Sequence, residues 1–312
     1  GRLHAEHGVL FVVPEDRRIA QDILVAPADA GRAKAGQVVS VALLAHPSKH
    51  AKPIGRVVEV LGNYADPGME IEIALRKFDL PHEFSKRAEA QARMLPDAVR
   101  EEDAKGRRDL RMHHFVTIDG ETAKDFDDAV YAVREAKEKG GGFRLWVAIA
   151  DVSHYVRHGD ALDAEARERG TSVYFPRRVI PMLPEKLSNG LCSLNPQVDR
   201  LAMVCEMTIT SAGSVARYEF YPALFRSHAR LTYIEVWAKL SADKAGAHLA
   251  TLYEVFKALY AARGQRGAID FETLETRMEF DAHGKIRRIV AEPRNDAHRL
   301  IEECMLAANV CA

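Results

Sequence analysis

Cysteine is scarce in this 312-residue sequence, and no two cysteines have the close spacing of a zinc site or a redox motif. The four cysteines are Cys192, Cys205, Cys304 and Cys311. We therefore expect free, buried thiols in a protein of the reducing cytoplasm. Apolar runs of about 18 residues are missing, as is the layout of a signal peptide, so neither a membrane span nor secretion is indicated.

An excess of positive charge is also missing, because 44 Lys and Arg stand against 45 Asp and Glu, for a net charge of −1. The chain as a whole is therefore not an electrostatic nucleic-acid binder. Any nucleic-acid contact must come from a local basic surface, or from metal ions that offset an acidic site. The 47% hydrophobic and 29% charged residues are typical of a soluble globular protein, and the length predicts about two domains.

Positions 1–77 contain short β-forming runs separated by turn residues such as Asp66-Pro67-Gly68. The expected strands are Gly8–Val13, Asp22–Val25, Gln37–Ala45, Gly55–Leu61 and Glu70–Ala74. Five short strands at this spacing predict a small barrel, with an OB-fold as the leading candidate. Barrels of the cold-shock type bind single strands through stacked aromatic residues and a basic groove, but this stretch offers mainly Phe11 as an aromatic.

Positions 78–108 change character and predict a helical linker. Phe84–Leu95 has helical spacing, Pro96 interrupts it, and a second short helical run reaches about Ala104. The basic cluster in KGRRDLR at the end of the linker is either a solvated face or a phosphate contact.

Positions 109–312 alternate hairpins with helices, which predicts a mixed α/β domain and an α+β fold for the whole chain. The expected hairpins join Ala129–Arg134 to Phe143–Asp151, Leu201–Thr210 to Ala216–Ser227, and Arg277–Phe280 to Ile286–Ala291 around His283-Gly284. The expected helices are Leu162–Arg169 with Gly170 as its cap, Arg230–Leu240, His248–Ala262, and a last helix that starts near Asn295.

The stretch FVTIDGETAKDFDD places four aspartates between two apolar runs. Phe115–Ile118 has the residue types of a strand, Gly120 opens a short loop, and the apolar run 129–133 follows. The four aspartates are Asp119, Asp125, Asp127 and Asp128.

Carboxylates a few ångströms apart cannot all ionise cheaply. A hard cation removes the repulsion, and Mg²⁺ prefers oxygen ligands, often carboxylates together with a substrate phosphate. If the loop doubles back, Asp119 lies beside the other three aspartates, and the cluster shares one or two Mg²⁺ ions. The alternative is an acidic turn that faces solvent. Asp151 ends a nearby apolar strand, and we favour a structural role for it over a fifth ligand.

The stretch TIDGETAKDFDDAVY resembles the catalytic motif of the ribonuclease II/RNB family of 3′→5′ exoribonucleases. Other stretches resemble the same family in the same order, among them GGGFRLWVAIADVSHYV, RGTSVYFP, VIPMLPEKLSNGLCSLNPQVDRL and RNDAHRLIEECMLAAN. The resemblance covers essentially the whole chain. It implies a cold-shock-like OB domain at 1–77, the linker at 78–108, and an RNB catalytic domain at 109–312 that is incomplete at its C-terminus. The arginine that the family uses at the scissile phosphate is expected beyond Ala312, so activity of this stretch alone stays open.

The resemblance implies that Asp119, Asp125, Asp127 and Asp128 are the catalytic and metal-binding residues, with one or two Mg²⁺ ions as cofactor. Four further residues match RNA-contacting positions of the family. Tyr174 matches the tyrosine against the 3′-terminal nucleotide, Phe271 matches the aromatic at the other end of the stacked bases, and Tyr233 and Glu302 match the pair that contacts ribose.

For each of these RNA-contacting residues a structural alternative stays open. The aromatic residues could be core, and Glu302 could be an exposed helix residue. Since Glu303 adjoins it, the position of the ribose contact is uncertain by one residue. His298 lies one helical turn before Glu302, where a lone histidine is more often structural.

The function implied is a metal-dependent hydrolytic exoribonuclease that degrades single-stranded RNA processively from a free 3′ end to nucleoside 5′-monophosphates. One alternative is a catalytically inert RNA-binding fragment or RNA chaperone. Another is a DNA nuclease or phosphatase with the same metal cluster, against which Tyr233 and Glu302 favour RNA. No membrane is indicated, and protein partners remain unknown.

Overall fold

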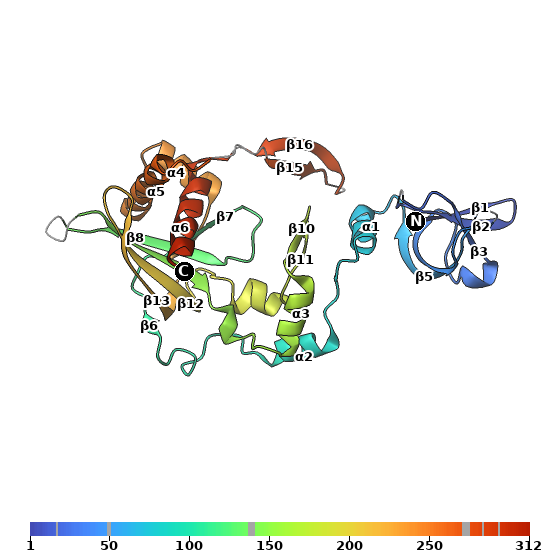
Figure 1. Cartoon of the computed structure of the whole chain (residues 1–312), viewed down its shortest axis with the longest axis horizontal. Helices are drawn as coiled ribbons and strands as arrows, with labels where there is room; N and C mark the ends of the chain where they lie inside the picture. The colour runs from blue at the N-terminus through green and yellow to red at the C-terminus, as the bar shows by residue number, and fades with distance from the viewer. Residues whose placement is uncertain (17, 49–50, 137–140, 270–274, 283, 293) are drawn as a thin grey trace. The chain divides into compact units, whose positions relative to one another are not determined.

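The computed structural model describes residues 1–16, 18–48, 51–136, 141–269, 275–282, 284–292 and 294–312. The chain divides into two compact units (Figure 1). The first unit comprises Gly1–Glu83, Tyr174–Ile180 and Arg277–Val290. The second comprises Phe84–Val173, Pro181–Thr276 and Ala291–Ala312. Within the described residues, no helix combines the length and apolar character that crossing a bilayer requires.

The first unit is built on a closed barrel of five strands in the order β1-β2-β3-β5-β4. The strands are β1 (Arg2–Glu6), β2 (Val9–Val13), β3 (Ile23–Val25), β4 (Gln37–Ala45) and β5 (Ile54–Asn63). Apolar residues at alternate positions of these strands fill the interior, with Leu3, Val12 and Val39 almost fully buried. The predicted small barrel of OB type is therefore confirmed.

Two predictions about the strands of this barrel were wrong. The fifth expected strand, Glu70–Ala74, lies inside helix α1 (Met69–Lys77), and β1 was not expected. The alternation of glutamate with Ile71 and Ile73 imitates a strand. A helix forms instead because it buries Met69 and Leu75 and brings Glu72 within reach of Arg76 one turn later.

Two short hairpins complete the first unit. One pairs β10 (Val173–Phe175) with β11 (Arg178–Ile180). The other pairs β15 (Glu275–Phe280) with β16 (Ile286–Glu292), as the sequence predicted, although His283 of its turn lies outside the described residues.

The second unit is organised on a seven-stranded sheet in the order β14-β7-β8-β9-β12-β13-β6. Its strands are β6 (Arg108–Asp109), β7 (Val116–Asp119), β8 (Asp128–Arg134), β9 (Phe143–Ala150), β12 (Asp199–Ile209), β13 (Val215–Arg226) and β14 (Ala229–Thr232). The central strands are antiparallel, and the predicted hairpins β8–β9 and β12–β13 are confirmed. The edge strands β14 and β6 instead run parallel to β7 and β13.

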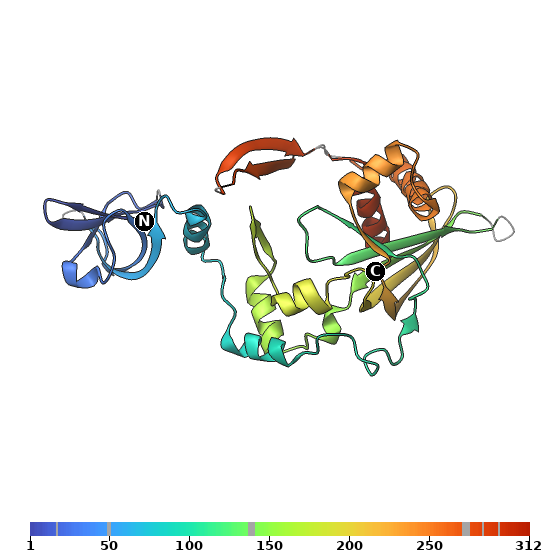
Figure 2. The same cartoon turned by 180° about the vertical axis from the view of Figure 1, so that it is seen from behind.

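Three helices cover one face of this sheet: α4 (Tyr233–Ser241), α5 (Ala247–Gln265) and α6 (Asp296–Cys311). Figure 1 shows them together above the strands, and the orange and red helices of Figure 2 lie together in the same way from behind. Val147 of the sheet, Val255 of α5 and Cys304 of α6 belong to the core that they enclose. The last helix, expected to start near Asn295, begins at Asp296 with Asn295 as its N-cap. All four cysteines are buried, as predicted, and their thiols are free.

The core on the other side of the sheet includes residues from α2 (Lys86–Met94), α3 (Ala161–Arg169) and the π-helical turn η4 (Lys186–Leu191). Helix α2 follows its N-cap Ser85, and α3 ends at Gly170, whose φ of 73° suits glycine. The second helical run expected in the linker, up to Ala104, forms turns instead. The helix expected to begin at Arg230 begins at Tyr233, because the preceding residues form β14 beside β7.

Candidate active site

The acidic loop, residues 119–128, joins the end of β7 to the start of β8 (Figure 1). Asp119 is the last residue of β7, and Asp128 is the first residue of β8. Main-chain hydrogen bonds hold the second half of the loop, since Ala150 N donates to Asp127 O over 2.9 Å and Leu194 N to Phe126 O over 2.8 Å. The loop thus carries its carboxylates at one end of two neighbouring strands.

The four aspartates predicted from the sequence lie close enough for their negative charges to interact. Burial, followed by repulsion from Asp128, Asp127 and Asp125, raises the pKa of Asp119 to about 7, although Arg230 opposes this rise. Burial and then Asp127 raise the pKa of Asp128 to about 6. Burial and then Asp125 raise the pKa of Asp127. A cluster of carboxylates that resists ionisation in this way is suited to a cation.

The donor atoms of this cluster fit a hard divalent cation. The Oδ2 atoms of Asp119 and Asp128 are buried and have no hydrogen-bond partner. Unsatisfied buried carboxylate oxygens are costly, and Mg²⁺ selects oxygen ligands of this kind. Over the part of the chain that the structure describes, however, no three His, Cys, Asp or Glu side chains form a group already placed to hold a metal ion.

Asp151 lies at the end of β9, and its carboxylate is engaged by protein groups. Arg107 Nη2 donates to it over 2.6 Å, and Ser153 Oγ donates over 2.7 Å. Burial opposes ionisation of Asp151, but these hydrogen bonds hold its pKa below the usual value. These contacts support the structural role preferred from the sequence.

Tyr233 lies beside the same end of the sheet. It opens α4, directly after Thr232, which pairs with Asp119 in the register of β14 on β7. A capping box between Thr232 and Glu235 fixes this helix start. The ring of Tyr233 stacks on the imidazole of His298 in the first turn of α6.

The neighbouring glutamates of α6 have different surroundings. The side chain of Glu302 is 42% exposed and pairs with Arg294, whose Nε lies 3.1 Å from Oε1 of Glu302. The side chain of Glu303 is 5% exposed and pairs with Arg263 of α5 over 2.5 Å. Glu302 is therefore the one of the two that a ligand can reach.

Of the two remaining predicted RNA-contacting residues, the structure describes Tyr174. Tyr174 belongs to β10 of the first unit, where its side chain is exposed. Phe271 lies outside the described residues. The exposure of Tyr174 differs from the core alternative considered for it.

Two residues that hold the acidic loop were missed by the sequence analysis, namely Ser193 and Arg230. Both make hydrogen bonds to main-chain atoms of the loop. Ser193 is a lone hydroxyl in the apolar run LCSL, and a polar residue in such a run was the available signal.

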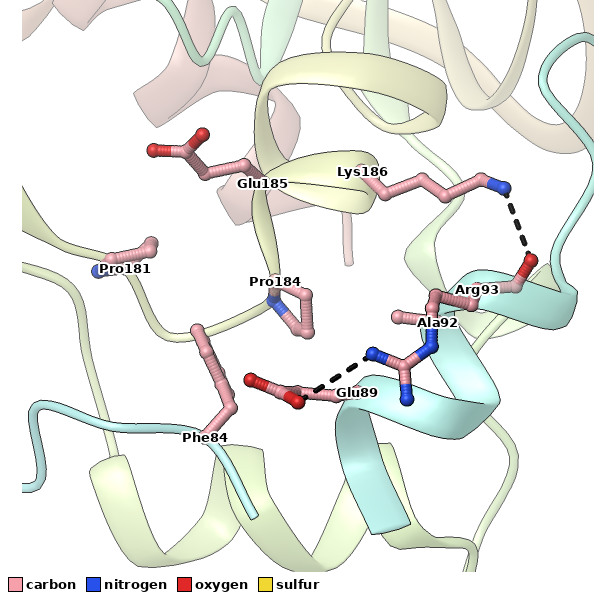
Figure 3. Close-up of a pocket in the computed structure, with 8 residues that line it drawn as sticks. All are labelled: Phe84, Glu89, Ala92, Arg93, Pro181, Pro184, Glu185 and Lys186. Atoms are coloured by element: carbon pink, nitrogen blue, oxygen red, sulfur yellow. Dashed lines mark hydrogen bonds and ion pairs between the residues drawn. The ribbon is translucent and has the colours of Figure 1, made fainter. Parts of the chain in front are cut away.

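A pocket of about 400 Å³ lies elsewhere in the second unit, between α2 and the segment 181–186 (Figure 3). Phe84, Ala92, Pro181 and Pro184 give it apolar walls, and Glu89 and Arg93 form an ion pair of 3.5 Å at its edge. None of the acidic-loop residues lines it.

Sequence models of known domains match both parts of the chain. The model of the RNB domain matches residues 107–312, and that of a cold shock domain matches residues 11–85. The chain therefore belongs to the RNB family, as its motifs indicated.

The most similar relatives include ribonuclease R of Escherichia coli, which is 52% identical over 320 residues that cover 100% of this chain. Ribonuclease R of Thermotoga maritima is 44% identical and matches 96% of this chain. The chain spans 39% and 43% of the length of these two relatives.

Among solved structures, RNase R of Mycoplasma genitalium in complex with ribose-methylated single-stranded RNA matches 99% of this chain with a TM-score of 0.91. The identity is 30%, and 49% of that chain is covered. Yeast Ssd1, a pseudonuclease, matches 84% of this chain and 34% of its own with a TM-score of 0.66. At 19% identity, that likeness concerns the fold alone.

Proposed function

We propose that this chain is part of a metal-dependent 3′→5′ exoribonuclease that hydrolyses RNA processively, from a free 3′ end, to nucleoside 5′-monophosphates. Membership of the RNB family and 52% identity to a ribonuclease R support the reaction class. The observation that carries the proposal is the acidic loop, in which Asp119, Asp127 and Asp128 have raised pKa values and two buried carboxylate oxygens lack partners.

The four aspartates of the acidic loop are the residues that would hold the cofactor. One or two Mg²⁺ ions bound there would supply an activated water and neutralise charge on the leaving oxygen. The protein contributes the fixed carboxylates at the strand ends and their burial, which strengthens electrostatic interactions. Without a cation, the same carboxylates repel a phosphodiester.

Tyr233 and Glu302 are proposed to read the ribose. A 2′-hydroxyl is both donor and acceptor, and a phenol together with a carboxylate can satisfy both roles. Support comes from the position of Tyr233 next to the Asp119 end of β7 and from the exposure of Glu302. Tyr174 and Phe271 are proposed to stack against the terminal bases, an interaction that tolerates any base.

The alternative is a catalytically inert RNA-binding protein. The fold does not distinguish this alternative from an exoribonuclease, because a pseudonuclease shares the fold. The residues favour hydrolysis, since the chain keeps all four carboxylates of the motif. A protein that only binds RNA gains nothing from buried, mutually repelling carboxylates, which lower its affinity for phosphate.

The test is Asp127→Asn in the full-length protein, with Asp109→Asn as the matched control. Asp109 is an exposed aspartate of the second unit that pairs with Arg111. We expect Asp127→Asn to abolish RNA decay and to keep or tighten RNA binding, because a metal ligand and a charge that repels phosphate are both lost. The control keeps both properties. Decay by Asp127→Asn at the rate of the unmodified protein would contradict the proposal.

A further inference from the structure

The acidic loop has little regular structure of its own between its two strands. Residues 120–127 form neither a helix nor a strand, and one turn closes from Ala123 N to Gly120 O over 3.2 Å. A loop of this kind keeps its carboxylates in place only through contacts with other segments. Two side chains distant in sequence, Arg230 and Ser193, provide such contacts.

Arg230 holds the start of the loop from the neighbouring strand β14. Its Nη2 donates to Gly120 O over 2.9 Å and to Glu121 O over 2.8 Å. Its guanidinium also lies over the ring of Phe126, 5.4 Å from the ring centroid. One side chain thus links the two ends of the loop.

Ser193 holds the second half of the loop from the segment that follows η4. Its hydroxyl accepts from Phe126 N over 3.0 Å and donates to Lys124 O over 2.9 Å. The residue is fully buried, and its carbonyl accepts from Nε of the buried Arg200 over 2.6 Å. Ser193 therefore fixes the main chain on either side of Asp125.

These contacts leave Oδ2 of Asp119 and Oδ2 of Asp128 without a hydrogen-bond partner. Both Nη2 hydrogen bonds of Arg230 go to carbonyl oxygens, although the guanidinium is close enough to lower the pKa of Asp119. An arginine paired directly with the carboxylates would compete with a cation. The pattern suits a residue that shapes a metal site without occupying it.

We propose that Arg230 and Ser193 are positioning residues that set the spacing of the four carboxylates for a divalent cation. This inference rests on the proposed function, because it assumes that the acidic loop is the metal site. A merely structural role predicts that losing either side chain lowers stability and leaves cation affinity unchanged.

The test measures Mn²⁺ binding to the chain by calorimetry, together with thermal unfolding in EDTA. The variants are Arg230→Met and Ser193→Ala. The matched controls are Arg226→Met, which removes an exposed arginine paired with Asp199, and Ser227→Ala, which removes a buried serine hydroxyl that donates to Ala229 O.

We expect Arg230→Met and Ser193→Ala each to weaken Mn²⁺ binding about tenfold or more, the usual effect of groups that orient ligands. The controls keep the affinity, and Arg230→Lys recovers part of it because an ammonium can still donate to one carbonyl.

The outcomes separate this inference from the proposal on which it rests. If the unmodified chain binds Mn²⁺ and both variants bind it equally well, the positioning role is wrong and the metal site stands. If the unmodified chain binds no more Mn²⁺ than Asp127→Asn does, the metal assignment fails, and the positioning role fails with it. If Arg230→Met does not fold, Ser193→Ala decides by the same comparison.

Discussion

The ring of Tyr233 stacks on the imidazole of His298 with centroids 4.0 Å apart and planes 20° apart. The contact joins the start of α4 to the first turn of α6, one turn before Glu302. The two proposed ribose-contacting residues are thereby held on adjoining helices, and this contact supports the structural role that the sequence favoured for His298.

The phenol hydroxyl of Tyr233 is expected to contribute to recognition of RNA over DNA. Tyr233→Phe keeps the stack on His298 and removes the hydroxyl, so decay of RNA relative to a matched DNA oligomer should fall about three- to tenfold, the value of one neutral hydrogen bond. Tyr233→Ala should reduce the ratio further, because the stack is also lost. The measurement is the ratio of initial decay rates in the full-length protein, and an unchanged ratio in both variants would assign Tyr233 to packing.

Substitutions of the two neighbouring glutamates of α6 should change different properties, recognition of ribose in one case and stability in the other. Glu302→Gln should lower discrimination against deoxyribose and leave the free energy of unfolding nearly unchanged, because its ion pair is partly exposed. Glu303→Gln should lower the free energy of unfolding by about 1–3 kcal/mol, because Arg263 loses a buried partner. Urea unfolding and the RNA/DNA decay ratio measure the two effects. If Glu303→Gln lowers the decay ratio and Glu302→Gln does not, Glu303 is the ribose contact.

Asp151 is expected to stabilise the second unit without binding metal. Asp151→Asn leaves the largely buried Arg107 without its charged partner, which should cost about 3–5 kcal/mol of unfolding free energy. Mn²⁺ affinity should stay unchanged. The double variant with Arg107→Met should recover part of the loss, because no buried charge remains unpaired. A tenfold loss of Mn²⁺ affinity in Asp151→Asn would instead make this residue a fifth ligand.

The raised pKa values of Asp119 and Asp128 predict how stability depends on pH without metal. Folding raises these values to about 7 and about 6, so the folded state binds protons more tightly than the unfolded state. Stability in EDTA should therefore fall as pH rises from about 4 towards 7, which is the window between the unfolded and folded values. Asp119→Asn should make that fall shallower and raise the Tm at pH 8.

Added Mg²⁺ should restore the Tm of the unmodified chain at pH 8, because a ligand of the folded state stabilises it. The same Mg²⁺ should change the Tm of Asp119→Asn much less. A Tm in EDTA that rises with pH over this window, or that Asp119→Asn leaves unaltered, would show that the carboxylates do not repel one another as inferred.

Local pattern was enough to predict the strands around the acidic loop, the hairpins of the sheet and the start of α6. Each depends on residues close in sequence: apolar runs, turn residues, or the side chain of Asn295. The prediction failed at α1, where the alternation of Ile71 and Ile73 has the period of a strand but the segment forms a helix that buries Met69 and Leu75.

Contacts between remote segments could not be predicted in this way. Residues 229–232 form a strand only because β7 lies beside them, more than a hundred residues earlier in the chain. The hydrogen bond from Arg230 to Gly120 joins residues 110 positions apart, and that between Ser193 and Phe126 joins residues 67 positions apart. No local sequence pattern predicts contacts over such separations. The aspartates were recognisable because their spacing is local, whereas the groups that hold them were not.

The most direct test of the account is a time course of RNA decay by the full-length protein, with 5′-labelled linear RNA and circular RNA of the same sequence, in Mg²⁺ or in EDTA. We predict that linear RNA shortens from its 3′ end to nucleoside 5′-monophosphates in Mg²⁺ only, and that circular RNA survives. Cleavage of the circle, or equal decay of linear RNA in EDTA, would contradict a metal-dependent 3′→5′ exoribonuclease.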